Sequence, residues 1–211
     1  MSTGTTGRAT AQASHEQINA LRAAQALKDQ RRKLRIHLTW VGVTVAVIGI
    51  VAAMMLTSRQ QTSSVARVAP DFTLTNTAGA AVSLSGLRGK NVLLYFSEGA
   101  GCEACLVQMN QIENDPAFAA AGLAVLPIVM NTKDQITADM ATNGVRTPFL
   151  LDDGSVSTAY GTIGKGMHAG LPGHSFVLID KAGNQRWYGE YPSMWLSTTD
   201  LLKEVNNHLA S

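Results

Sequence analysis

The sequence predicts an α/β three-layer sandwich with a central mixed sheet, preceded by one transmembrane helix. Three observations lead to this prediction. Short apolar, β-favouring runs alternate with helical patterns, a hairpin pattern follows late in the chain, and one long uncharged segment precedes them all. With 211 residues, 45% of them hydrophobic, the chain suits one domain of ordinary size plus an appendage.

The uncharged segment is LTWVGVTVAVIGIVAAMML, residues 38–56. As a helix, its nineteen residues would span about 28 Å, close to the roughly 30 Å of a hydrocarbon core. A cleaved signal peptide is the alternative, but its apolar core would be shorter, and 37 residues precede this one. We therefore expect an uncleaved transmembrane helix over residues 38–57.

Cations are concentrated before this segment. Seven lysines and arginines precede it, and only Arg59 and Arg67 follow it closely. The positive-inside rule then predicts a single-pass protein of the cell membrane, with a cytoplasmic N-terminus and an extracytoplasmic main domain. The tail has two acids and a charge of +5, so the overall +2 leaves −3 beyond it. This balance argues against nucleic-acid binding by the main domain.

The predicted organisation has four parts. Residues 1–37 form a basic cytoplasmic tail, partly disordered, and residues 38–57 form the transmembrane helix. Residues 58–67 form a polar linker, and residues 68–211 form the folded domain. The domain is long enough to bury a core of its own.

The elements of the folded domain follow in order. Expected are short paired strands around residues 76–80, a central strand at 92–96, a helix over 102–114, a strand over 123–130, a helix over 133–143, a short strand within 148–151, a hairpin over 175–191 and an amphipathic helix over 197–209. Pro127 predicts an edge or a bulge in the second long strand. The glycine-rich segment 160–174 is expected to be a loop.

The two cysteines of the chain, Cys102 and Cys105, stand where the central strand leads into the first helix. The first turn of a helix favours a thiolate, so Cys102 is expected to be the attacking thiol. Cys105 follows one turn later, with the Cβ atoms roughly 5 to 6 Å apart, so a disulfide can close and reopen without a change of fold. So small a ring stabilises a fold little, which favours reversible exchange.

Other uses of two cysteines are weighed against this one. A zinc site would need further ligands such as His168 and His174. Covalent haem attachment is excluded, because Leu106 rather than a histidine follows Cys105. An inert disulfide or a pair of buried thiols stays open as an alternative. We expect redox chemistry that uses no metal and no cofactor.

Several segments together resemble a known family. They are APDFTL, then VSLSGLRGKNVLLYF, then a CxxC at a helix start, and late in the chain SFVLIDKAGN. They resemble the thioredoxin superfamily, specifically its alkyl hydroperoxide reductase/thiol-specific antioxidant (AhpC/TSA, redoxin) branch and the membrane-tethered thiol-disulfide oxidoreductases beside it. The resemblance covers about residues 68–209. It implies a thioredoxin-like sheet, with Cys102 as nucleophile and Cys105 as resolving thiol.

The chain departs from this family pattern around the cysteines. Peroxiredoxins carry Thr or Ser three residues before the peroxidatic cysteine, and Gly99 stands there. The oxidoreductases usually have an aromatic residue before the first cysteine, where this chain has Gly101. Glu103 adds a negative charge that should destabilise the thiolate, which predicts a reductant. Gly101 and Glu103 are also expected to contact the substrate.

The resemblance further implies a cis-proline beside the cysteines. Pro172 is the candidate, unless Gly173 replaces it, and either would contact the substrate. His174 could then face Cys102 and supply a proton or a positive charge. A histidine that caps the edge of the strand is the alternative.

Three functions follow as hypotheses. The first is a membrane-anchored thiol-disulfide oxidoreductase that exchanges disulfides with partner proteins outside the cytoplasm and takes electrons from a donor, for example one in the membrane. The second is a peroxiredoxin-like antioxidant that reduces peroxides through Cys102. The third is a non-catalytic binding module on a redoxin scaffold, whose cysteines are vestigial or structural.

Overall fold

The structure is a computed structural model, and it describes residues 32–33, 35–54, 61–165 and 168–210. The chain divides into two units, Met1–Thr57 and Ser58–Ser211. Most of the predicted basic tail, the end of the predicted transmembrane helix and the first residues of the predicted linker lie outside the described residues. Each unit is described by itself.

The first unit contains a helix, Arg35–Met54, of 20 residues. By length and composition it could cross a membrane. It begins three residues before the uncharged segment, so Arg35 and His37 are part of the same helix. Its large apolar side chains, such as Trp40 and Ile48, are exposed rather than packed into a core. Such a surface suits contact with lipid.

The second unit is built on a mixed sheet, which within the described residues has eight strands. In spatial order these are β1 (Gln61–Val68), β8 (Asn184–Glu190), β7 (Ser175–Ile179), β4 (Asn91–Phe96), β5 (Leu123–Val129), β6 (Leu150–Leu151), β2 (Thr73–Asn76) and β3 (Ala81–Ser83). The pairs β4–β5 and β5–β6 are parallel, and the others are antiparallel. The predicted mixed central sheet is thereby confirmed.

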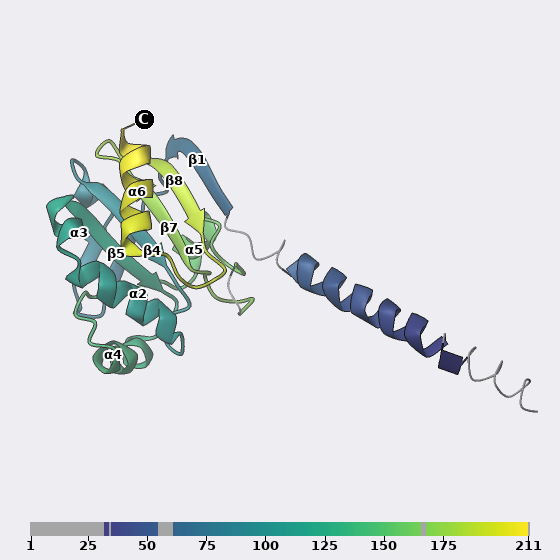
Figure 1. The fold of residues 1–211 in the computed structure, drawn as a ribbon. Coiled ribbons are helices and arrows are strands. Elements are labelled where there is room, and N and C mark those ends of the chain that lie inside the picture. The colour runs from purple at the N-terminus through teal and green to yellow at the C-terminus, as the bar shows by residue number, and fades with distance from the viewer. Residues whose placement is uncertain (1–31, 34, 55–60, 166–167, 211) are drawn as a thin grey trace, which may run out of the picture. The chain divides into compact units, whose positions relative to one another are not determined.

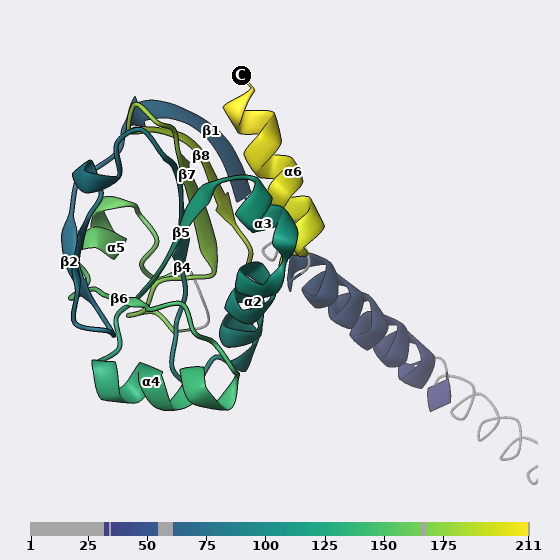
Figure 2. The same ribbon diagram turned by 90° about the vertical axis from the view of Figure 1, so that its left-hand side faces the viewer.

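Helices cover both faces of this sheet and make the three layers. One face carries α2 (Glu103–Asn114), α3 (Pro116–Ala120) and α6 (Thr198–Leu209), and the other carries α5 (Ser155–Ala159), as Figures 1 and 2 show. Side chains of β4 alternate between two cores: Leu93 and Tyr95 face α2, and Leu94 and Phe96 face the opposite side. The remaining helices are η1 (Ser85–Leu87) and α4 (Lys133–Thr142), and α4 contacts α2.

Two local expectations need correction. Most of the predicted polar linker, from Gln61 on, is the strand β1, which pairs with β8. Backbone hydrogen bonds to an edge strand need no apolar side chains, so the composition gave no signal. Pro127 does not lie in an edge strand, because β5 has β4 on one side and β6 on the other. However, β6 pairs only with Ile128 and Val129, so no strand pairs with Pro127 on that side.

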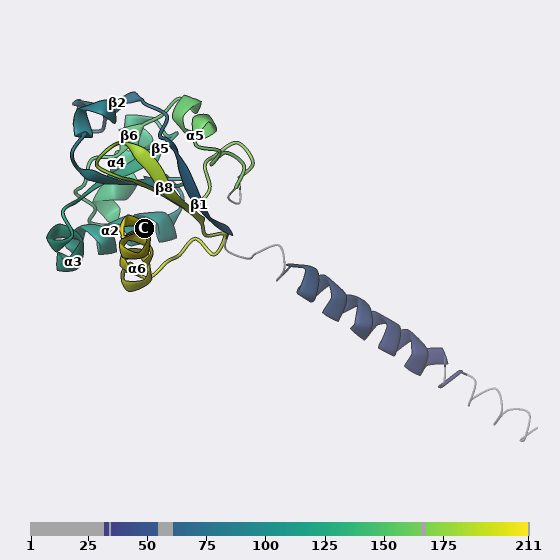
Figure 3. The ribbon, with the colours of Figure 1, turned by 90° about the horizontal axis from the view of Figure 1, so that it is seen from above.

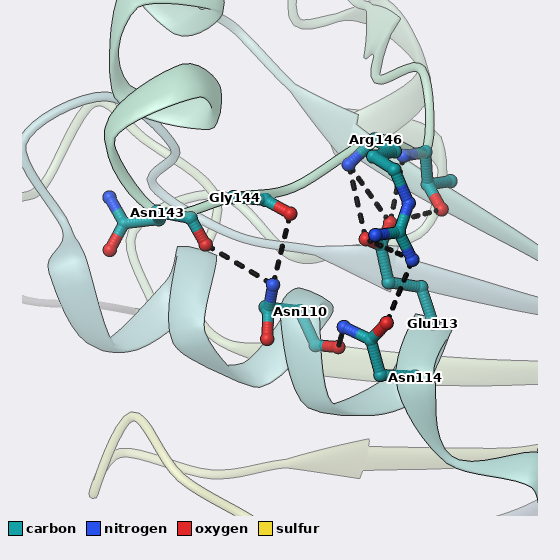
Figure 4. Close-up of polar contacts among 7 residues, drawn as sticks. Asn110, Glu113, Asn114, Asn143, Gly144 and Arg146 are labelled. Carbon is teal, nitrogen blue, oxygen red and sulfur yellow. Dashed lines mark hydrogen bonds and ion pairs between the residues drawn. The ribbon is translucent and has the colours of Figure 1, made fainter.

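A polar network fixes the far end of α2 to the loop that follows α4 (Figure 4). Asn110 donates through Nδ2 to the backbone oxygen of Gly144 at 3.0 Å. The carboxylate of Glu113, which is almost fully buried, accepts bonds from the backbone nitrogens of Arg146 and Thr147. Since α2 begins at the cysteine pair, these bonds also hold that pair in position against the sheet.

Candidate active site

Cys102 and Cys105 form a disulfide at the start of α2, with their Cα atoms 5.3 Å apart. Cys102 is the N-cap of the helix and is partly exposed, whereas Cys105 lies in the first turn with none of its surface accessible. The structure therefore brings the two sulfur atoms together as the sequence predicts. Of the two cysteines, only Cys102 has surface that a partner molecule can reach.

The turn that delivers Cys102 is held by side chains from the segment after β5 and from α4. The backbone nitrogen of Ala100 donates to Oδ1 of Asn131 at 2.9 Å, and that of Gly101 donates to Oδ2 of Asp139 at 2.8 Å. The nitrogen of Cys102 donates to the oxygen of Gly99 at 3.0 Å. These bonds fix the turn before the helix begins, so Cys102 is presented on a rigid support.

Gly99 stands where peroxiredoxins have Thr or Ser, and the structure leaves no room for a side chain there. Its φ is +75°, and a Cβ atom would lie 2.0 Å from Oδ1 of Asn131 and 2.8 Å from Cγ1 of Val129. A hydroxyl residue would therefore displace the bond from Asn131 that holds the turn. The position cannot supply a hydroxyl to a peroxide in this conformation.

The stability of a thiolate at Cys102 is affected by charges of both signs. The N-terminus of α2 favours a thiolate there. Glu103 follows Cys102 directly in the chain, and Asp139 accepts a hydrogen bond from the nitrogen of Gly101, which precedes Cys102. The negative charges of these two carboxylates disfavour a thiolate. A less stable thiolate would make the reduced pair a better electron donor.

His174 lies against Cys105 and Tyr95 rather than on the surface. Its Nδ1 is 3.9 Å from the sulfur of Cys105 and 3.3 Å from the hydroxyl of Tyr95. Burial lowers the pKa of His174 to about 3, so the imidazole is neutral at physiological pH. The prediction that His174 faces Cys102 is therefore corrected, because the sulfur that it approaches is the buried one of Cys105.

The hydrogen bonds around His174 indicate which ring nitrogen carries the proton. Tyr95 donates its hydroxyl proton to the backbone oxygen of Cys105 at 3.1 Å, so its oxygen is left to accept from Nδ1 of His174. Nε2 is buried and has no partner among the described residues. Burying an unprotonated Nε2 without a partner costs less free energy than burying an N–H group without an acceptor. We therefore assign the proton to Nδ1.

The neighbouring loop corrects the implied cis-proline. No cis peptide bond occurs among the described residues, so Pro172 is trans. Pro172 and Gly173 are buried, and the nitrogen of Gly173 donates to the oxygen of Thr162 within the loop itself. Since Pro172 stands one residue farther from β7 than the family pattern has it, His174 is the residue that reaches the cysteine pair. Gly101 and Glu103 are exposed beside Cys102, whereas the burial of Pro172 and Gly173 corrects the expectation that they contact a substrate.

His168, the other histidine that a zinc site would need, has a different partner. Its Nδ1 lies 2.7 Å from Oε2 of Glu98, and its backbone nitrogen donates to Oε1 of the same carboxylate. Glu98 is buried directly after β4, whereas the side chain of His168 is 66% exposed. The pair ties the glycine-rich loop to the cysteine turn.

Sequence reasoning missed four residues that support this site: Tyr95, Glu98, Asn131 and Asp139. Two of them carried a usable signal. Glu98 is a charged residue inside an otherwise glycine-rich turn, and Asn131 follows a parallel strand whose carboxyl end lies beside that of β4. Tyr95 and Asp139 match the apolar and helical patterns around them, so only the fold reveals their contacts.

The fold and the disulfide together define a thioredoxin-like redoxin. The chain belongs to the AhpC/TSA family, whose profile matches residues 65–187. It is 34% identical over 99 residues to a candidate peroxiredoxin of Mycobacterium tuberculosis, which covers 46% of this chain and 63% of that one. It is 29% identical over 134 residues to the thiol-disulfide oxidoreductase ResA of Bacillus subtilis, covering 62% and 74% of the two chains.

A solved structure agrees in fold. It is that of a candidate protein disulfide isomerase from Bacteroides thetaiotaomicron, with a TM-score of 0.54 and 28% identity, covering 69% of this chain and 89% of that one. The chain thus spans less than two thirds of the mycobacterial relative and most of the two others. The family and the fold are shared, and these relatives are named for two different activities.

Proposed function

We propose that the protein is a membrane-anchored thiol-disulfide oxidoreductase that reduces disulfides of partner proteins outside the cytoplasm. One observation carries this proposal: the disulfide joins a partly exposed Cys102 at a helix N-terminus to a fully buried Cys105. A partner can reach the first sulfur only, and the second sulfur is already within bonding distance of the first. This asymmetry suits exchange through a mixed disulfide.

The proposed reaction starts from the reduced pair. The thiolate of Cys102 attacks one sulfur of the partner's disulfide, that bond breaks, and the partner's other sulfur leaves as a thiolate and takes up a proton. Cys105 then loses its proton and attacks the sulfur of Cys102. The mixed disulfide breaks, the partner leaves with two thiols, and Cys102–Cys105 is oxidised. Two electrons have passed to the partner, and an external donor must return them.

In this proposal His174 acts on the second step. Its Nδ1–H lies between the hydroxyl oxygen of Tyr95 and the sulfur of Cys105, so it can donate a hydrogen bond to the thiolate of Cys105. A neutral donor is the form that this buried site favours, because a charged imidazole would be desolvated. His174 therefore stabilises the resolving thiolate and does not itself need to carry a charge.

The surface around Cys102 is proposed to receive the partner. Gly101 and Glu103 flank the exposed sulfur and would touch the partner's chain. Pro172 and Gly173 are buried, so we assign them the indirect role of shaping the loop that carries His174. The exposed carboxylate of Glu103 favours a partner with a cationic residue near its disulfide.

The helix Arg35–Met54 is proposed to be the anchor, with the residues before it in the cytoplasm and the redoxin domain on the other side. The asymmetry of cations supports that orientation, because six precede the helix, Arg35 begins it, and two follow it closely. Compartments outside the cytoplasm favour disulfides, so a reductant there needs an electron donor. A membrane protein that carries a dithiol would be a suitable donor, because it can pass electrons from the cytoplasm to the redoxin domain.

Reduction of peroxide is the second candidate, and membership of the AhpC/TSA family favours it. In that reaction the thiolate of Cys102 would attack one peroxide oxygen, the O–O bond would break, and the other oxygen would leave as an alcohol or water. The sulfenic acid formed on Cys102 would then be attacked by Cys105, which gives the disulfide and a molecule of water. The closed space at Gly99 counts against a fast reaction, since no hydroxyl can stand there to orient the peroxide.

One comparison of substrates tests the proposal. The full chain in detergent should accelerate the reduction of insulin disulfides by dithiothreitol, and Cys102→Ser should lower this to the uncatalysed rate. The reduced protein should consume hydrogen peroxide no faster than free cysteine does. Fast peroxide consumption without insulin reduction would favour the peroxidase instead. If the protein reduces neither insulin nor hydrogen peroxide, the binding module would be favoured.

A further inference from the structure

A pocket of about 260 Å³ lies between β1, β8 and the segment that follows α5. Six of its lining residues carry the inference: Arg67, Tyr160, Lys165, Gln185, Tyr188 and Glu190. Tyr160 and Tyr188 belong to the core on the face of the sheet opposite α2, whereas Cys105 belongs to the core beneath α2. Figure 3 shows β1 and β8 side by side, with α5 above them. The redox pair is therefore on the other face.

The guanidinium of Arg67 is oriented toward this pocket by one hydrogen bond. Its Nε donates to Oε1 of Gln185 at 2.9 Å. Its two terminal nitrogens have no hydrogen-bond or ion-pair partner among the described residues, so their N–H groups are available. The side-chain amide of Gln185 is held by the same bond and adds a further donor at its own nitrogen.

A buried carboxylate in the same pocket is already compensated. Glu190 is 5% exposed, accepts a hydrogen bond from the hydroxyl of Tyr188 at 3.2 Å, and has Nζ of Lys165 at 3.7 Å. Lys165 thus offsets the charge of Glu190, and Arg67 is left as the uncompensated charge. The three charged residues sum to +1, so the pocket attracts an anion rather than an amine.

We propose that this pocket binds a small organic monoanion. Its carboxylate would lie on the terminal N–H groups of Arg67, which match a carboxylate in geometry, and its apolar part would lie between the rings of Tyr160 and Tyr188. The volume is slightly below the roughly 300 Å³ at which ligand pockets usually begin, so it suits an acid with a single ring. This proposal is independent of the redox function.

Calorimetric titration of the full oxidised chain in detergent with benzoate tests the proposal. Benzoate should bind with saturation, and benzamide, which has the same ring without the charge, should bind at least about tenfold more weakly. Arg67→Gln should weaken benzoate binding by a similar factor. Lys181→Gln, which removes an exposed cation in the turn between β7 and β8, should leave it unchanged.

A second variant should act in the opposite direction, which a merely misfolded protein could not do. Glu190→Gln keeps the shape of the side chain and removes its charge, so Lys165 becomes uncompensated and benzoate should bind several times more tightly. Equal affinity for benzoate and benzamide, no effect of Arg67→Gln, or weaker binding in Glu190→Gln would each overturn the proposal.

Discussion

Replacing Cys105 with alanine is expected to convert the protein from a catalyst that releases its partners into one that retains them. Cys102 keeps its exposed position at the start of α2 and can still attack, but no second sulfur is left to displace the captured partner. Mixed disulfides should therefore accumulate in cells that express Cys105→Ala. They should be detected as conjugates in which the partner is attached at Cys102 and which a reducing agent cleaves.

The matched control for this experiment is the double variant Cys102→Ala/Cys105→Ala. It has the same cavity at position 105 and no attacking thiol, so it should capture nothing. The identity of the captured proteins tests the orientation as well, because they should be exposed outside the cytoplasm. Capture of cytoplasmic proteins alone would overturn the orientation. Absence of any conjugate, with Cys102 still reactive toward a small alkylating reagent, would overturn the exchange reaction.

Replacing His174 with leucine is expected to slow the second step of the reaction. The thiolate of Cys105 loses the hydrogen bond that Nδ1 offers at 3.9 Å, at a position where both residues are buried. A hydrogen bond to a charged group contributes about 1.5 to 3 kcal/mol, which corresponds to roughly a 10- to 100-fold slower resolution. Rapid-quench measurement of the mixed disulfide should show it forming at a normal rate and decaying slowly.

His174→Asn is the matched control, because the amide nitrogen of asparagine can stand near the place of Nδ1 and still donate. It should restore much of the rate. A purely structural role of His174 would make both variants slow in both steps. Equal decay rates in the native protein and His174→Leu would contradict the assigned role.

The variant His174→Leu should also change how the stability of the protein responds to acid. Unfolded histidine titrates near pH 6.5, whereas in the fold the pKa of His174 is lowered to about 3 by burial. The unfolded state therefore binds an extra proton between these values, and stability falls as the pH falls, by up to about 1.4 kcal/mol per unit. In His174→Leu, thermal unfolding should depend less on pH between 7 and 4. An unchanged pH dependence would contradict a neutral, buried His174.

The order of elements and the position of Cys102 could be read from the sequence because they depend on local patterns. The apolar run that became β4, the hairpin of β7 and β8, and Cys102 at the start of α2 all follow from residues near one another in the chain. Such features need no knowledge of tertiary contacts.

Features that depend on distant segments were missed or misplaced. β1 gains its strand conformation from pairing with β8, more than a hundred residues later. His174 approaches Cys105 rather than Cys102 because β7 lies antiparallel to β4, whose Tyr95 also faces that core. The closed space at Gly99 depends on Asn131, which reaches it from the end of β5. No spacing within the sequence encodes these distances.

The most direct test is a redox titration of the full chain, in which the Cys102–Cys105 bond is followed by mass after alkylation. We expect a single two-electron transition, with a tenfold change in the ratio of oxidised to reduced protein for every ~30 mV. Its midpoint should lie nearer that of thioredoxin, about −270 mV, than that of DsbA, about −120 mV. A bond that stays closed in every buffer, or two cysteines that are alkylated independently of each other, would contradict a reversible redox pair.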